Sequence, residues 1–125
     1  MITRVFLAVV GAAYLALAGW CVAQPTRTAN SVGFELLGGS GRSEYFVVYG
    51  GLQHGLGLIF LWPLAQPHVE RFSLTSCLVI HLCLVIMRCI SFGVFSGIGT
   101  TTYFLAATEW LILLASVWRY FAAKP

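Results

Sequence analysis

Four long runs of apolar residues, separated by shorter polar stretches, set the pattern of this chain. The runs cover residues 5–23, 45–64, 72–95 and 101–121. Each is close to the roughly 20 residues that an α-helix needs to cross a hydrocarbon core of about 30 Å. The pattern predicts an all-α fold, an antiparallel bundle of four transmembrane helices that forms a single integral membrane domain over residues 1–125.

The composition strengthens the membrane interpretation. Of the 125 residues, 59% are hydrophobic and only 9% are charged, and the mean hydropathy is +0.88. A soluble domain carries about 25% charged residues, so this chain has too little polar surface for a water-soluble globule. Its seven Lys and Arg residues are scattered rather than clustered. We therefore expect no nucleic-acid partner.

The longest polar stretch, residues 24–43, is predicted to be an outer loop. Pro25 is expected to end the first helix. Asn30 or Ser31 is placed to cap a short helical turn over residues 34–37. Three glycines would then break that turn: Gly38, Gly39 and Gly41. A short interfacial or re-entrant segment and a plain mobile loop are both compatible with this sequence.

Positive charge predicts the orientation of the bundle. The side that holds both termini carries four cationic residues, and the other side carries Arg27 and Arg42. Cytoplasmic loops hold the excess of Lys and Arg in membrane proteins, so both termini are expected in the cytoplasm. The four residues on the terminal side are Arg4, Arg71, Arg119 and Lys124.

Small residues mark candidate surfaces for helix packing. Gly51 and Gly55 form a GxxxG pair in the second apolar run, a spacing that lets a neighbouring backbone approach closely. Three more glycines are candidate packing positions: Gly50, Gly57 and Gly93. Ala8, Ala12 and Ala16 form a similar ridge on the first helix.

Two ionisable groups lie at matching depths in the third and fourth apolar runs. Arg88 is about seven residues before the end of one helix, and Glu109 is about eight residues after the start of the next. At about 1.5 Å of rise per residue, both are roughly 10–12 Å below the outer surface. A paired guanidinium and carboxylate costs less in lipid than either alone. The sequence therefore predicts an Arg88–Glu109 contact, with Glu44 as a second candidate acceptor.

Two roles for this pair stay open. It can be a structural ion pair that fixes how two helices dock, or part of a polar pocket near the outer face. Further polar side chains at nearby depths are the candidate lining of such a pocket: Glu44, Tyr45, Tyr49, Gln53, His54, His81 and Tyr103.

No complete catalytic set is present, and no Cys and His spacing indicates a metal site. We therefore predict no catalytic residues, no metal and no cofactor. A haem held by His54 and His81 is disfavoured, because their depths differ by about 6 Å.

Two stretches, RSEYFVVYGGLQHGLGLIFLW and MRCISFGVFSGIGTTTYFLAATEWLILLASVW, resemble a family of small four-helix bacterial membrane proteins. That family is designated a domain of unknown function and is related to the DoxX-like proteins. The resemblance implies a four-helix bundle in the bacterial inner membrane and no established reaction. The positions that carry it are Arg42, Tyr45, Tyr49, Gly50, Gly51, Gly55, Gly57, Arg88, Gly93 and Glu109.

These observations give two functional hypotheses. The first is an accessory or scaffold subunit of a larger membrane complex, such as a respiratory or photosynthetic one. Its partners would be membrane lipids and other membrane protein subunits. The alternative is a lipid- or quinone-binding protein, or an enzyme, that holds a small lipophilic ligand near Arg88 and Glu109. A non-enzymatic role is the leading hypothesis, because no catalytic set accompanies the pair.

Overall fold

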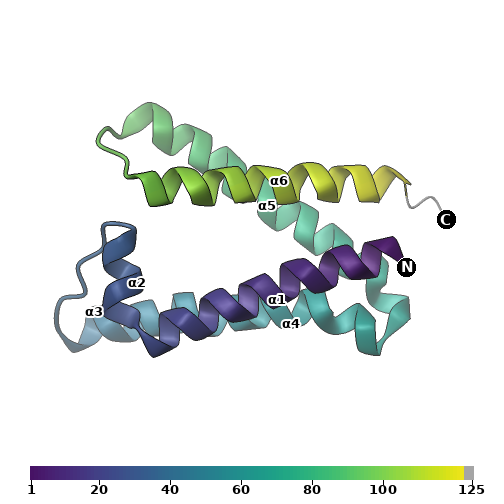
Figure 1. Ribbon diagram of the computed structural model, residues 1–125, viewed down its shortest axis with the longest axis horizontal. Helices are drawn as coiled ribbons and strands as arrows, with labels where there is room; N and C mark the ends of the chain where they lie inside the picture. Colours follow the sequence, from purple (N-terminus) through teal and green to yellow (C-terminus); the bar gives the residue numbers. More distant parts are fainter. Residues whose placement is uncertain (123–125) are drawn as a thin grey trace.

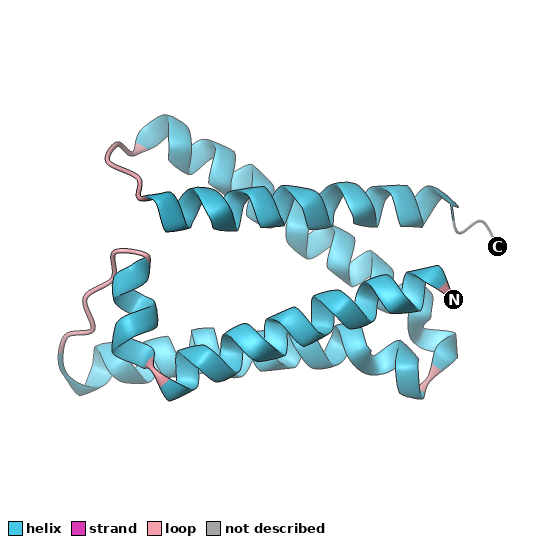
Figure 2. Cartoon of the chain, in the orientation of Figure 1, coloured by secondary structure: helices cyan, strands magenta, loops and turns pink. Residues whose placement is uncertain are grey.

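The computed structural model of the chain describes residues 1–122, and it is helical over nearly all of them (Figure 2). No strand occurs in this range. The elements in chain order are α1 (Ile2–Ala23), α2 (Pro25–Ser31), α3 (Gly38–Tyr45), the π-helical η1 (Phe46–Leu52), α4 (Gln53–Ala65), the short 3-10 helix η2 (Pro67–Val69), α5 (Glu70–Val94) and α6 (Thr100–Ala122).

Within residues 1–122, four helical stretches are long and apolar enough to span a membrane. These spans are Ile2–Ala23, Gly38–Ala65, Pro67–Val94 and Thr100–Ala122. The all-α prediction and the number of spans are confirmed. The chain is a multi-pass membrane protein whose apolar helices contact lipid.

Residues 24–43 differ from the predicted outer loop. Pro25 is the first residue of α2, where a missing backbone N–H costs nothing and the fixed φ suits a helix. Gly33, with φ of 83°, follows the end of α2. Residues 34–37 are not helical, so the expected helical turn is displaced towards the N-terminus. The glycines at 38–41 form the first turn of α3 instead of breaking a helix, because α3 continues directly into a long apolar helix.

The second span begins seven residues earlier than predicted. It is continuous through α3, η1 and α4, and the middle part, Phe46–Leu52, is π-helical. A π-helical stretch bonds residues five apart rather than four, so it changes which side chains share a face. Faces deduced from α-helical spacing therefore do not apply directly across this stretch.

Two pairs of helices dominate the packing. The first pair is α1 with α4, and the second is α5 with α6 (Figure 1). The main core lies where α1, α4 and α5 meet, and it holds Leu7, Val10, Phe60, Leu74 and Cys77. Met1 and the end of α6 lie at the same end of the molecule (Figure 1).

Glycine decides how closely α1 and α4 approach. A Cβ built on Gly11 would lie 2.9 Å from the carbonyl oxygen of Gly57, and one on Gly57 would lie 3.1 Å from that of Gly11. A Cβ on Gly50 would lie 2.7 Å from a methyl of Val22. Side chains larger than hydrogen at Gly11 or Gly57 would force the two backbones apart.

The other predicted packing glycines lie elsewhere. A Cβ on Gly51, Gly55 or Gly93 would meet no atom within 4 Å. On α1, Ala12 and Ala16 are exposed, because the buried residues of that helix lie on a different stripe. That stripe comprises Thr3, Leu7, Val10, Gly11, Ala18 and Cys21.

Candidate functional site around the Arg88–Glu109 pair

Arg88 on α5 and Glu109 on α6 form a bidentate ion pair. Nε of Arg88 donates to Oε2 of Glu109 at 2.9 Å, and Nη2 donates to Oε1 at 2.6 Å. The two side chains are 24% and 15% exposed. Two parallel charge-assisted bonds hold both planar groups in one geometry. The pair therefore ties α5 to α6 within the spanning segments and removes two isolated charges from the lipid.

The pair lies between two other contacts of the same helices. On one side of it, Sγ of Cys77 is 3.4 Å from Oγ of Ser116. On the other, the rings of Phe92 and Tyr103 are 5.1 Å apart. Tyr103 belongs to this α5–α6 contact and is 53% exposed, so it is not enclosed in a pocket.

His81 is buried where α1 meets α5. Its Nδ1 donates to the carbonyl oxygen of Cys77 at 2.8 Å, which leaves Nε2 as the acceptor of the Tyr14 hydroxyl at 3.2 Å. Both ring nitrogens are therefore engaged. Tyr14 also meets the ring of Phe60 at 5.4 Å.

Tyr45 and Tyr49 form a separate cluster on the second span. Their rings stack with centroids 4.5 Å apart. The Tyr45 hydroxyl donates to Oγ1 of Thr28 at 3.0 Å and contacts Sγ of Cys21 at 3.6 Å. These bonds hold α2 against α1 and the second span.

The remaining predicted residues do not join the pair. His54 donates from Nδ1 to the carbonyl oxygen of Gly50, one turn earlier, at 2.8 Å. Glu44 is exposed. Oε1 of Gln53 is buried and has no hydrogen-bond partner. Among residues 1–122, no group of three or more His, Cys, Asp and Glu side chains is placed to hold a metal ion.

Sequence reasoning missed two polar partners, Tyr14 and Ser116. Each contacts a residue of α5 that is 67 or 39 positions away along the chain. A hydroxyl in the middle of an apolar run is a weak signal by itself, since it can bond to its own helix backbone. Only the arrangement of α1, α5 and α6 reveals their partners.

The Tyr14–His81 hydrogen bond is expected to make a small contribution to the stability of the fold. Tyr14→Phe removes the hydroxyl and is expected to lower the free energy of unfolding by about 0.6 kcal/mol, the mean for interhelical hydrogen bonds in membranes. Unfolding in mixed micelles as the SDS fraction rises measures this difference. Tyr103→Phe is the matched control and should change stability less, because the Tyr103 ring contact with Phe92 is kept. Equal losses in the two variants would contradict this assignment.

The fold and the site define a small membrane protein of four apolar spans, two of which are joined by a bidentate ion pair. The chain belongs to the family described as Domain of unknown function (DUF4345), whose sequence profile matches residues 2–120. The predicted membership in a family of unknown function is thus confirmed. No curated protein and no solved structure matches the chain.

Proposed function

We propose that this protein is a non-catalytic accessory or scaffold subunit that associates laterally with other membrane proteins. The observation that carries this proposal is the open glycine face of the second span. Gly51 and Gly55 are exposed, and a Cβ on either would meet no atom within 4 Å. Two exposed apolar side chains continue this face from Gly55 at α-helical spacing within α4: Leu58 and Trp62. An apolar helix face whose central residues have no side chain lets a helix of another protein approach closely.

The low helix propensity of glycine supports the presence of a partner helix from another protein. Glycine in a helix interior is about 1 kcal/mol less favourable than alanine. Gly11 and Gly57 offset that cost through the close approach of α1 and α4. Gly51 and Gly55 have no such contact within residues 1–122. Lipid chains adapt to alanine as readily as to glycine, so a helix from another subunit is the partner that benefits from these two residues.

The proposed setting is the inner membrane of a bacterium, with both termini cytoplasmic. Arg4, Arg71 and Arg119 gather at the end that holds Met1, and this supports the orientation. The fourth residue of that prediction, Lys124, lies outside the described residues. Antiparallel helix pairs are supported by the order of their contacts, since Gly11 meets Gly57 and Val22 meets Gly50. The relation to DoxX-like proteins stays a prediction.

Gly55→Leu tests the accessory-subunit proposal. The added side chain projects from the open face and is expected to abolish co-migration with a larger complex, while the four-helix fold persists. Native membranes are extracted in mild detergent and separated by native electrophoresis, with the folded fraction measured in parallel. Gly19→Leu is the matched control, because a Cβ on Gly19 also meets nothing within 4 Å but lies on α1. Normal co-migration of the Gly55→Leu variant would contradict the proposal.

One observation favours the second candidate, a small-ligand protein. Oε1 of Gln53 is buried without a partner, and a buried acceptor of this kind costs about 1–3 kcal/mol unless a donor reaches it. A lipophilic ligand could satisfy this oxygen only if it carries a hydrogen-bond donor, such as the hydroxyl group of a lipid or of a reduced quinone. Organic extraction of the purified protein distinguishes the two candidates. A lipophilic molecule that is retained by the native chain and lost in Gln53→Leu supports this second function.

A further inference from the structure

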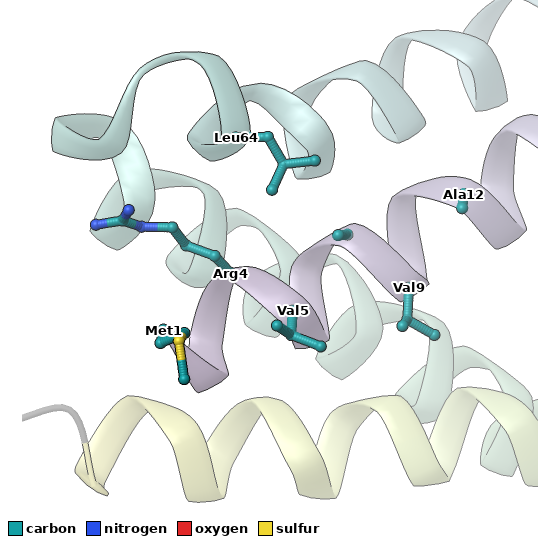
Figure 3. A pocket seen from close by; sticks show the side chains of 7 residues that line it. Met1, Arg4, Val5, Val9, Ala12 and Leu64 are labelled. Atoms are coloured by element: carbon teal, nitrogen blue, oxygen red, sulfur yellow. The ribbon is translucent and has the colours of Figure 1, made fainter.

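An open groove runs along α1 near the end of the molecule that holds Met1 (Figure 3). It is separate from the glycine face of the second span, and its volume is about 690 Å³. Its lining is almost wholly apolar, and one residue is charged. The lining residues are Met1, Arg4, Val5, Ala8, Val9, Ala12 and Leu64.

The shape of the groove follows from side-chain size. Ala8 and Ala12 are small and keep the middle of the groove close to the α1 backbone. Val5, Val9 and Leu64 project beside them, with 59%, 65% and 58% of their surface exposed. From Val5 to Ala12 the helix rises by about 10 Å. A groove of this length and composition fits part of one acyl chain that lies along the helix.

The charge at the mouth of the groove selects the headgroup. Arg4 is the charged lining residue, and its side chain is 41% exposed. Glu70 accepts from its Nε at 2.7 Å, so the two Nη groups are not committed to that ion pair. Two more arginines lie at this end: Arg119 donates to Thr3, and Arg71 lies over the Tyr120 ring. Even without Arg71, the guanidinium groups of Arg4 and Arg119 outnumber the carboxylate of Glu70, so these described residues carry a net positive charge.

We propose that the groove binds an anionic glycerophospholipid. One acyl chain lies against Ala8 and Ala12, and the phosphate accepts hydrogen bonds from the Nη groups of Arg4. A guanidinium is well suited to a phosphate because it donates two bonds in one plane. The positive end favours a lipid with net negative charge over a zwitterionic lipid of the same chain length. The site is independent of the proposed subunit role, because it uses a different surface.

Native mass spectrometry of the full chain in detergent micelles tests the charge requirement. The probes are phosphatidylglycerol and phosphatidylcholine with identical acyl chains. The native protein should retain phosphatidylglycerol preferentially, and Arg4→Gln should lower that retention about fivefold, as the loss of one surface cation predicts. Glu70→Gln breaks the same ion pair but keeps Arg4, so it should retain the lipid. Arg27→Gln, on α2 beyond the far end of α1, is the charge control.

A second pair of variants tests the groove itself. Ala12→Leu fills the groove and should lower phosphatidylglycerol retention, whereas Ala13→Leu adds the same bulk at an exposed neighbouring position that does not line the groove. The proposal is overturned by equal retention of the two lipids in the native protein. It is also overturned by equal loss in Arg4→Gln and Arg27→Gln, or in Ala12→Leu and Ala13→Leu. Each of these results would show only non-selective contact with the surrounding lipid.

Discussion

Arg88→Met is expected to leave little folded protein in the membrane. The substitution removes both hydrogen bonds to Glu109, at 2.9 and 2.6 Å, and leaves the carboxylate without its counter-charge inside a spanning segment. Removing one partner of a buried ion pair costs about 3–5 kcal/mol. That loss is a large part of the roughly 5–15 kcal/mol that stabilises a typical fold. Size-exclusion chromatography in detergent, with the yield of monodisperse protein as the readout, measures the effect.

The double variant Arg88→Met/Glu109→Gln distinguishes the effect of an unpaired charge from the effect of losing the contact between α5 and α6. It removes both charges, so folding should recover to a large extent even though the bidentate contact is gone. Recovery supports a structural role for the pair. Normal folding of Arg88→Met with loss of a bound lipophilic molecule would instead support the pocket. Failure of the double variant to fold better than Arg88→Met would contradict the electrostatic explanation.

Gly11→Val is expected to destabilise the protein by about 3 kcal/mol, near the upper end of the usual cost of overpacking. The new Cβ would lie 2.8 Å from Cγ of Leu61 and 2.9 Å from the carbonyl oxygen of Gly57. A side chain such as Leu61 can move, but the α4 backbone at Gly57 cannot yield without separating the two helices. Unfolding in mixed micelles as the SDS fraction rises measures the change in stability.

The control for this prediction lies on the same helix. Gly19→Val introduces the same side chain at a position with no atom within 4 Å of the new Cβ. It should therefore have little effect on folding, apart from small differences in helix propensity. A disulfide between cysteines introduced at Val22 and Gly50 would report whether α1 stays against the second span. Equal stability of the Gly11→Val and Gly19→Val proteins would contradict the close helix approach.

Some features follow from the sequence because they depend on length and composition alone. Four apolar runs of sufficient length predict four spans, since lipid requires every backbone polar group to be bonded within its own helix. The depth of Arg88 and Glu109 follows from the constant rise of a helix, and the structure places the two groups in direct contact. The position of a residue along its helix axis thus follows from its residue number, whereas the identity of the neighbouring helix does not.

The direction in which each side chain points around its helix was decided by the tertiary structure. Sequence spacing indicated Gly50, Gly51, Gly55 and Gly57 alike as packing positions, but the contact with α1 uses Gly50 and Gly57 and not the other two. A π-helical stretch shifts the phase between such positions. Tyr45 and His54 likewise acquire separate partners. The physical reason is that rotation about a helix axis is set by packing against other helices, which apolar composition alone does not encode.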